Sequence, residues 1–463
     1  MNFIKESQDL NKLNKYFCLN SKSFCDFSVG AKYLWKDEFR CEYFDDGENL
    51  VIKESTRDYE NAFYFPFGKD ADKSLNLIEN YALKNYRELK FCCLTLEQAE
   101  FLQKRYKNTE LSFDRSWSDY FYNFLDFCYF RGKKFSGQRN HINKFLKTYK
   151  NVTFRRLEIK DFKRVEEFLL NYKLENEFSY WTQEVENQNV LDYILNFEKL
   201  NQVGGVLLDG EKIIGLTVGE VVNDTLIVHV EKALKSYSGI YPYLASEYAK
   251  LFMDLDINYI NREEDCGDLG LRKSKTQYHP IEIKNKYFLT VSTNFINIER
   301  PVEILAERIK IGEILESDKE EYFKLYTDEK LNEFWGYDYK EDLKGEVMPD
   351  YFFEFQNSLK KSKEEYPLAI KLKDKLIGEI TVYNFDFNRS CEIGFRLLKE
   401  YQNNGYAIEA VLAMQKFLKD SVKIERLNVS AYIKNHNSIK LIEKAGFKFN
   451  YQDQEKKYYF LEL

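Results

Sequence analysis

Proline and histidine are scarce in this chain of 463 residues, which contains six prolines and four histidines. Few prolines disfavour long proline-rich linkers. The histidines stand apart in the sequence and no Gly-x-Ser-x-Gly elbow accompanies them, so a serine–histidine triad is disfavoured, as is a histidine-rich metal site. No window approaches the roughly 18 uninterrupted apolar residues of a membrane helix, and we therefore expect no membrane span.

Cysteine pairs with the spacing of a metal site or a redox motif are also absent. The eight cysteines form no Cys-x-x-Cys motif and no Cys/His cluster with zinc spacing, so we expect no metal. Without a signal peptide, this pattern indicates reduced thiols and a cytoplasmic protein.

Positive charge is not in excess, because the net charge is −7. A whole-chain footprint for nucleic acid is therefore missing. Two local basic runs remain, residues 131–134 and 272–275, and we interpret both as solvated faces. The length predicts about three domains, and 44% hydrophobic residues indicate real cores.

An internal repeat is the most informative pattern in the chain. Twice, a β-hairpin is followed by a strand, a polar loop that ends in one glycine, and a helix. The pairs are hairpins at 205–220 and 368–383, strands at 225–230 and 390–397, Gly239 and Gly405, and helices at 240–253 and 407–418. Two copies of one α/β unit are therefore predicted.

The remaining segments extend this organisation. The further expected elements are a hairpin around 45–47, an extended segment at 62–66, helices at 73–86, 96–106 and 318–327, and strands at 287–291 and 308–311. We expect an α/β fold with mixed sheets and units at 1–150, 151–295 and 296–463.

The loop from Gln402 to Ala407 carries the clearest chemistry. It runs from a strand into a helix, whose free backbone N–H groups and macrodipole favour a bound phosphate. Gly405 lets the backbone approach the anion because it has no Cβ. One glycine before a helix is weak evidence alone, since an ordinary loop glycine is equally consistent with it.

Two longer segments, 390–410 and 435–447, together resemble the GNAT superfamily of acetyltransferases. Gln402-Asn-Asn-Gly-Tyr-Ala407 resembles its Q/R-x-x-G-x-G/A signature, and Lys444-Ala-Gly-Phe447 resembles its K-x-G-F close. Residues 306–311 and 335–337 are similar to the branch that acetylates ribosomal-protein N-termini and related amines. The resemblance covers about 160 residues and implies acetyl-CoA as co-substrate and a primary amine, on a small molecule or a protein N-terminus, as acceptor.

The resemblance also implies roles for individual residues. Backbone N–H groups of Asn403, Asn404, Gly405, Tyr406 and Ala407, after Gln402, would hold the CoA pyrophosphate. The strand with Ile393, Phe395 and Leu397 would pair with the pantetheine arm. Asn437 and Ser438 would face that arm.

Direct attack by the amine requires a group that accepts its proton. Glu392 and Glu379 are the candidates, and solvent-facing strand carboxylates are the alternative interpretation. Many GNAT members carry a tyrosine acid four residues before the glycine of the K-x-G-F close, where this chain has Ile442. Another group or water would protonate the thiolate, or the domain is not catalytic.

The first 295 residues resemble the C-terminal domain of phosphatidylglycerol lysyltransferases, on segments 132–145, 230–233, 239–241 and 259–275. That family is similar to tandem GNAT folds, so three consecutive GNAT-like folds are expected, the first degenerate. The resemblance implies a second site that would bind a phosphate-bearing donor or acceptor. Its candidate residues are Lys232, Gly239, Tyr241, Asn261, Arg262, Glu263, Arg272 and Lys275, with Asp265 beside them.

Three hypotheses for function stay open at this point. The first is acetyl transfer to an amine by the last third of the chain. The second is aminoacyl transfer from aminoacyl-tRNA by residues 1–293, although the acidic net charge argues against strong tRNA binding. The third is a CoA- or ligand-binding module without chemistry. The acceptor and the oligomeric state are not predicted.

Overall fold

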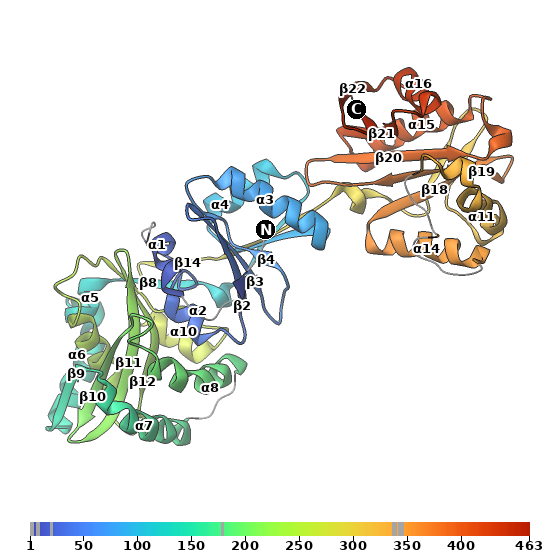
Figure 1. Cartoon of the computed structure of the whole chain (residues 1–463). Coiled ribbons are helices and arrows are strands. Elements are labelled where there is room, and N and C mark those ends of the chain that lie inside the picture. The colour runs from blue at the N-terminus through green and yellow to red at the C-terminus, as the bar shows by residue number, and fades with distance from the viewer. Residues whose placement is uncertain (1–3, 6–9, 19–21, 177–179, 336–339, 341–346) are drawn as a thin grey trace. The chain divides into compact units, whose positions relative to one another are not determined.

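The computed structural model describes residues 4–5, 10–18, 22–176, 180–335, 340 and 347–463. These residues form a mixed α/β structure with three mixed sheets (Figure 1), as the sequence predicts. The chain divides into two compact units: residues 1–78, 90–102 and 111–289 form one, and residues 79–89, 103–110 and 290–463 form the other. Gly336 and Tyr337, part of the quoted GNAT motifs, lie outside the described residues.

The first sheet has the strand order β1-β2-β3-β4-β6-β15-β7, with β5 paired to β3. Its strands are β1 Ile4–Lys5, β2 Arg40–Asp45, β3 Asn49–Ser55, β4 Ala62–Phe63, β5 Phe67–Gly68, β6 Glu88–Leu94, β7 Thr109–Phe113 and β15 Tyr287–Ser292. The predicted hairpin around Gly47 is confirmed as β2 and β3, which pair antiparallel. Helices α3 (Ala71–Asn85) and α4 (Leu96–Arg105) confirm two helix predictions.

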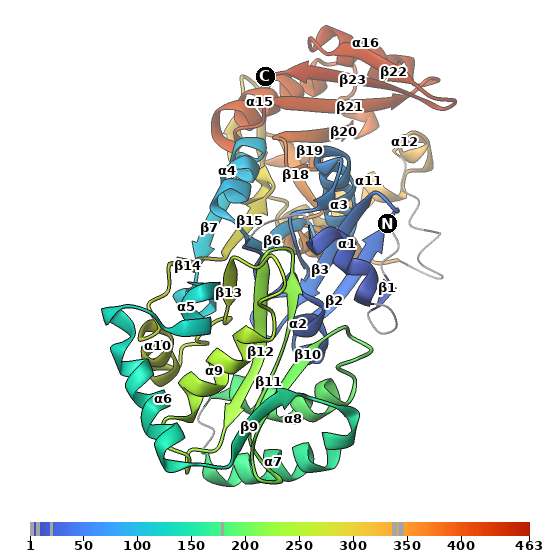
Figure 2. The ribbon, with the colours of Figure 1, turned by 90° about the vertical axis from the view of Figure 1, so that its left-hand side faces the viewer.

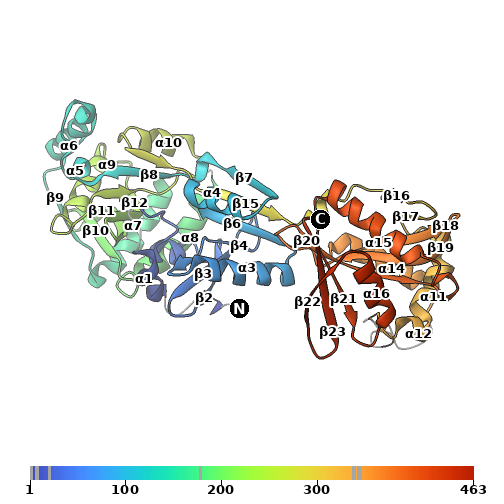
Figure 3. The ribbon, with the colours of Figure 1, turned by 90° about the horizontal axis from the view of Figure 1, so that it is seen from above.

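The second sheet has the order β14-β8-β13-β12-β11-β10-β9. Its strands are β8 Asp119–Asn123, β9 Val152–Arg156, β10 Val203–Asp209, β11 Lys212–Val222, β12 Thr225–Ala233, β13 Tyr259–Asn261 and β14 Glu282–Lys284. Helices α7 (Phe162–Glu175) and α8 (Trp181–Leu195) lie on the side of this sheet opposite α9 (Ile240–Lys250), as Figure 3 shows. The predicted hairpin, strand and helix of the first repeat copy are confirmed.

Segments cross between these two sheets. Strand β8 comes before the boundary predicted at residue 150 yet belongs to the second sheet, and β15 comes after it yet belongs to the first. Helix α6 (Ser136–Thr148) likewise precedes residue 150 and packs on α9. The sheets therefore do not separate at that position in the chain.

The third sheet has the order β16-β17-β18-β19-β20-β21-β23-β22. Its strands are β16 Glu303–Leu305, β17 Lys310–Gly312, β18 Glu365–Leu372, β19 Lys375–Tyr383, β20 Ser390–Leu397, β21 Arg426–Tyr432, β22 Lys448–Gln452 and β23 Lys456–Glu462. Helices α15 (Tyr406–Phe417) and α16 (His436–Lys444) cover one face, and α11 (Lys319–Thr327) and α14 (Pro349–Ser362) cover the other (Figure 1). The second repeat copy is confirmed as β18 to α15.

In the described residues, no helix is both long and apolar enough to cross a bilayer.

Candidate functional site

Strands β20 and β21 diverge in the middle of the third sheet. They pair in parallel only from Ser390 to Glu392, with Arg426 to Asn428 as partners. Beyond Glu392, β20 pairs with β19 as far as Leu397, while β21 pairs with β23 as far as Tyr432. The backbones of Ile393, Phe395 and Leu397 therefore border an opening between strands, where an extended ligand can add to a strand edge.

The predicted anion loop lies exposed between β20 and α15. Gly405 caps α15 with a φ of +82°, a conformation that favours glycine. The amide nitrogens of Gln402 and Asn404 donate to the carbonyls of Leu397 (3.0 Å) and Gln402 (2.9 Å). These two side-chain hydrogen bonds fix the conformation of the loop. The first backbone N–H groups of α15 have no acceptor within the helix, so they can donate to an anion.

Arg308 lies directly over this loop and was not predicted as a site residue from the sequence. Its Nη1 donates to the Asn404 carbonyl (3.0 Å) and its Nε to Glu409 (2.8 Å). A Cβ at Gly405 would lie 3.1 Å from Arg308 Nη2. The guanidinium therefore adds positive charge where the helix N-terminus already favours an anion.

Glu392 stands where the two strands begin to diverge. Its carboxylate accepts hydrogen bonds from Ser430 Oγ (2.9 Å) and Asn384 Nδ2 (3.1 Å), and Tyr383 is its partner on the neighbouring strand. Burial and the Glu392 charge raise the pKa of Tyr383, so this hydroxyl stays protonated. Glu392 is half-buried and acts as an acceptor, which suits a group that takes a proton.

Glu379, the other predicted base, is 1% exposed and lies in an ion pair. Arg396 binds one of its oxygens through Nε and Nη2 (2.9 and 2.7 Å), and Tyr322 donates to the other (2.7 Å). The Arg396 guanidinium also lies 4.2 Å from the ring centroids of Tyr326 and Trp335. This placement indicates that Glu379 holds α11 and Trp335 on the sheet, and it leaves Glu392 as the available carboxylate.

Helix α16 carries the remaining residues expected at the cleft. Asn437 is exposed and Ser438 half-buried in its first turn, where Asn435 caps the Ser438 N–H (3.2 Å). Ile442, at the position of the family's tyrosine, is 1% exposed and packs in the core with α15. A proton for the leaving thiolate has to come from another group or from water.

The first unit contains a different kind of site, a pocket with aromatic walls and carboxylates. It is lined by Cys25, Asp26, Ala31, Lys32, Trp35, Phe39, Trp117, Glu263, Glu264 and Cys266. Indole and phenyl faces beside carboxylates are a combination that attracts an organic cation. The pocket therefore suits a ligand with an ammonium group.

Lys286 lies buried among three acidic side chains, of which Asp26 and Glu264 line the pocket. Its Nζ contacts Asp26 (2.5 Å), Asp119 (2.8 Å) and Glu264. Burial is the main cause that raises the pKa of Glu264 to about 7. The charge of Lys286 opposes this rise, and the charges of Asp119 and Asp26 add to it. Cys25 and these three carboxylates lie close enough together to bind a metal ion. The Lys286 ammonium group already lies among them and neutralises part of their charge.

His229 lies between two carboxylates at the back of this region. Its Nδ1 is 2.7 Å from Glu263 and its Nε2 is 3.0 Å from Glu220. Burial alone would lower the pKa of His229, but hydrogen bonds and charge from Glu220 and Glu263 outweigh it and raise the pKa to about 9. The histidine is therefore an imidazolium at neutral pH.

The predicted second site divides into separate places. Asn261, Glu263 and Lys275 gather behind the pocket: Asn261 donates to Asp119 (2.7 Å) and accepts from the Glu263 N–H (2.8 Å). Lys275 donates to the Arg262 carbonyl (2.5 Å) and to the Glu264 carbonyl. The others lie in pairs elsewhere, Arg272 with Asp265, Arg262 with Glu231, Lys232 with Glu186 and Tyr241 with Ala233.

In the residues that the structure describes, the first repeat copy has no open counterpart of the CoA features. A Cβ at Gly239, which caps α9, would lie 2.6 Å from the His141 carbonyl of α6, so α6 covers this loop. Beyond the parallel pairing of β12 and β13, Arg262 and Glu231 form an ion pair (2.6 Å), with Arg262 4.7 Å from the Tyr278 ring. Protein atoms thus occupy both the loop and the space past the paired strands.

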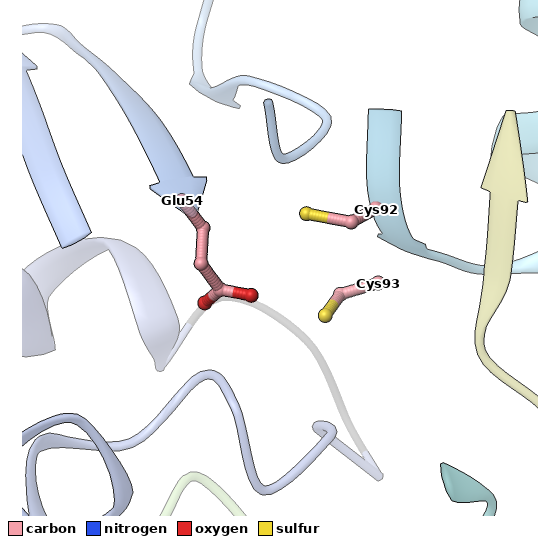
Figure 4. A group of neighbouring side chains, drawn as sticks. All are labelled: Glu54, Cys92 and Cys93. Atoms are coloured by element: carbon pink, nitrogen blue, oxygen red, sulfur yellow. The ribbon is translucent and has the colours of Figure 1, made fainter. Parts of the chain in front are cut away.

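Glu54, Cys92 and Cys93 also converge in the first unit (Figure 4). The Glu54 carboxylate is already bound by Lys32 (3.0 Å), Tyr64 (2.5 Å) and Tyr59 (2.6 Å). A metal ion at this carboxylate would have to displace a buried ammonium ion. The group is better explained as a charge-balanced part of the core.

Asp26, Trp117, Asp119 and Lys286 were not predicted from the sequence, because they come from three segments far apart in the chain. No spacing rule joins them. The sequence also assigns no role to His229, although Glu220, nine residues earlier, lies on the neighbouring strand.

Family comparisons agree with both resemblances. The model described as phosphatidylglycerol lysyltransferase, C-terminal, matches residues 20–290, and the model described as acetyltransferase (GNAT) domain matches residues 308–448. A conserved protein of unknown function from Bacteroides thetaiotaomicron VPI-5482 is 27% identical, with a TM-score of 0.59 over 63% of this chain and 99% of that one.

Two curated relatives match different parts of the chain. An uncharacterised protein of Mycoplasmoides gallisepticum is 25% identical over 231 residues, 48% of this chain and 71% of its own length. An uncharacterised N-acetyltransferase of Bacillus subtilis (strain 168) is 29% identical over 85 residues, 18% of this chain and 50% of its own length.

Proposed function

Because the chain belongs to the family of phosphatidylglycerol lysyltransferase C-terminal domains and also carries a GNAT acetyltransferase domain, we propose that it is an acyltransferase whose C-terminal domain acetylates a primary amine. The observation that carries this proposal is the opening between β20 and β21 beside the Gly405 loop. An extended arm and a pyrophosphate need this combination of a free strand edge and a helix N-terminus.

Acetyl-CoA, when bound, supplies an activated acetyl thioester. Backbone N–H groups from Asn403 to Ala407, with Arg308, would hold its pyrophosphate, and the edge of β20 would align its arm. The amine nitrogen then forms a bond to the acetyl carbonyl carbon while the carbon–sulfur bond breaks. Glu392 would accept the proton that the amine loses, directly or through one water, and would return it through water to the leaving thiolate, which departs as the thiol.

A charge placed in the loop tests this proposal. Gly405→Glu sets a carboxylate against the pyrophosphate and against Arg308, so acetyl-CoA binding in calorimetry and acetylation of an amine panel should both be lost. Gly446→Glu is the matched control, since Gly446 also has a positive φ, +90°, and has no atom within 4 Å of its Cβ position. Unchanged acetyl-CoA affinity in Gly405→Glu would rule out the loop assignment. Binding without turnover on the panel would instead favour the non-catalytic alternative.

We also propose that the chain contains three GNAT-like units, centred on the predicted ranges 1–150, 151–295 and 296–463. Each sheet supports this with the same run of two antiparallel pairings followed by a parallel one. The runs are β2-β3-β4-β6, β10-β11-β12-β13 and β18-β19-β20-β21. The first two units would exchange the strands β8 and β15.

A second function, aminoacyl transfer from aminoacyl-tRNA by residues 1–293, is supported by the pocket of the first unit. The aromatic faces of Trp35 and Trp117 there suit the ammonium group of an aminoacyl ligand. Transfer of labelled amino acid from charged tRNA to lipid or small hydroxylated acceptors tests it. Loss of transfer in Trp117→Ala, with the C-terminal acetylation intact, is the expected result, and no transfer by the wild type would exclude this function.

A further inference from the structure

A row of three half-buried side chains crosses the third sheet, and we call it the carboxylate row. Glu365 on β18 is paired with Tyr383 on β19, and Tyr383 is paired with Glu392 on β20. Figure 2 shows these strands side by side. Directly opposite residues of antiparallel strands point to the same side of a sheet. This side is the α11 side, because Glu379, four residues before Tyr383 on its strand, accepts a hydrogen bond from Tyr322 of α11 (2.7 Å).

The carboxylate row and the Gly405 loop lie on opposite faces of the sheet. The loop ends at the N-terminus of α15, which covers the other face. The opening between β20 and β21 begins just past Glu392 and connects the two faces. Trp335 borders the row, since a Cβ at Gly394, two residues after Glu392, would lie 3.3 Å from Cη2 of its indole. The rings of Trp335 and Tyr383 offer apolar surface to a short methylene chain.

The carboxylates of the row have no cation as partner. In the part of the chain that the structure describes, no lysine, arginine or histidine forms an ion pair with Glu365 or Glu392. Burial, together with the charges of Glu379 and Glu364, raises the pKa of Glu365 to about 7, while the charge of Arg87 opposes this rise. An ammonium group bound beside Glu365 would stabilise its charged form.

We propose that Glu365 is a specificity residue that selects acceptors with two amino groups; the inference rests on the acetyl transfer proposed above. One amine lies at Glu392 and attacks the thioester, while the second stays an ammonium ion, is held by Glu365 and is not acetylated. Two strand spacings separate the backbones of Glu365 and Glu392 by about 10 Å. With a hydrogen bond at each end, a chain of roughly three to five carbons between the nitrogens spans this distance. The acceptor class is therefore a short aliphatic diamine.

Acetylation of diaminobutane and of butylamine by the full chain tests this role, because the two acceptors differ only in the second amine. The wild type should acetylate diaminobutane with a kcat/KM about tenfold higher or more. Glu365→Gln should raise the KM for diaminobutane by about tenfold or more, the usual effect of losing a hydrogen bond to a charged group. Its kinetics with butylamine and its affinity for acetyl-CoA should not change.

Glu364→Gln is the matched control, because it removes the exposed glutamate next to Glu365 in the sequence and should leave both acceptors unaffected. Circular dichroism checks that both variants are folded. Equal kcat/KM for the two amines in the wild type would overturn the role of Glu365 and leave acetyl transfer in place. An unchanged KM for diaminobutane in Glu365→Gln, or the same loss in Glu364→Gln, would do so as well.

Calorimetry of diaminobutane with the full chain loaded with CoA adds a measurement that does not depend on turnover. If Glu365→Gln abolishes diamine binding but acetyl-CoA yields no product with the wild type, the diamine site stands and the acetyl-transfer function fails. If the wild type neither binds nor acetylates diaminobutane, the inference is overturned, whatever happens to butylamine.

Discussion

At the scale of single residues, two glutamates on neighbouring strands of the third sheet differ in the hydrogen bonds and ion pairs that the fold gives them. Glu379 and Glu392 are equally plausible bases in the sequence. Glu379 has both oxygens occupied by Arg396 and Tyr322, whereas Glu392 lies half-buried where β20 and β21 diverge. The sequence cannot make this distinction, because Arg396 and Tyr322 reach Glu379 only through the fold.

Glu392→Gln keeps the shape of this side chain and removes its basicity. We expect kcat for acetylation to fall by about 10²- to 10⁴-fold, the usual contribution of a general base. The KM for acetyl-CoA should change little, because Glu392 does not contact the pyrophosphate loop. Steady-state kinetics on the full chain measures both quantities.

Glu379→Gln is the informative comparison for that variant. It leaves Arg396 buried without its partner, and breaking a buried pair typically costs about 3–5 kcal/mol. Its main effect should be a lower unfolding midpoint. If Glu392→Gln retains full activity at every pH, the proton acceptor lies elsewhere.

His229 makes the stability of the first unit depend on pH. Its pKa is raised from 6.5 to about 9 in the folded state, so its stabilising contribution is complete below about pH 6.5 and lost as pH rises through 9. Urea unfolding of the wild type and of His229→Gln should therefore differ most at pH 6. The difference should shrink by about 3 kcal/mol by pH 10. A difference that stays constant with pH would contradict the ion-pair assignment of His229.

At the scale of elements, the repeat was predictable and its chemistry was not. Hairpins, strands and helices of both copies follow from alternating and helical periodicity, and both glycine-ended loops lie where expected. The loops differ in what covers them: Arg308 over Gly405 and the backbone of α6 over Gly239. Periodicity reports only contacts within a segment, so it cannot reveal which distant segment packs on a loop.

Gly239→Ala tests how tightly α6 closes the loop of the first repeat copy. A methyl group there would lie 2.6 Å from a backbone oxygen and would be strained at a φ of +86°. Gly132→Ala carries similar strain at +91° with nothing within 4 Å. We expect Gly239→Ala to be less stable than Gly132→Ala by about 1–3 kcal/mol, the usual cost of overpacking, in urea unfolding followed by circular dichroism. Equal stabilities would mean that α6 moves away easily.

At the scale of the whole molecule, two strands lie in a different sheet from the segment that surrounds them in the sequence. This exchange limits how well domain boundaries can be predicted from the sequence. Strands β8 and β15 each belong to the sheet built mainly by the other segment. A cut at residue 150 would remove β8 from the second sheet, although composition gives no sign of this. The pocket of the first unit has the same origin, since Cys25, Trp117 and Glu264 meet only after this exchange.

The number of acetyl-CoA molecules bound per chain follows from the two loops together. The C-terminal loop is exposed beside an opening between strands, whereas α6 covers the Gly239 loop and Arg262 with Glu231 occupies the space past the paired strands. Isothermal titration of the full chain with acetyl-CoA should therefore give one site per chain in the wild type. Gly405→Glu should bind none, and Glu231→Gln should still bind one. Two sites in the wild type, or one site that survives Gly405→Glu, would show that the lysyltransferase-like region also accepts CoA.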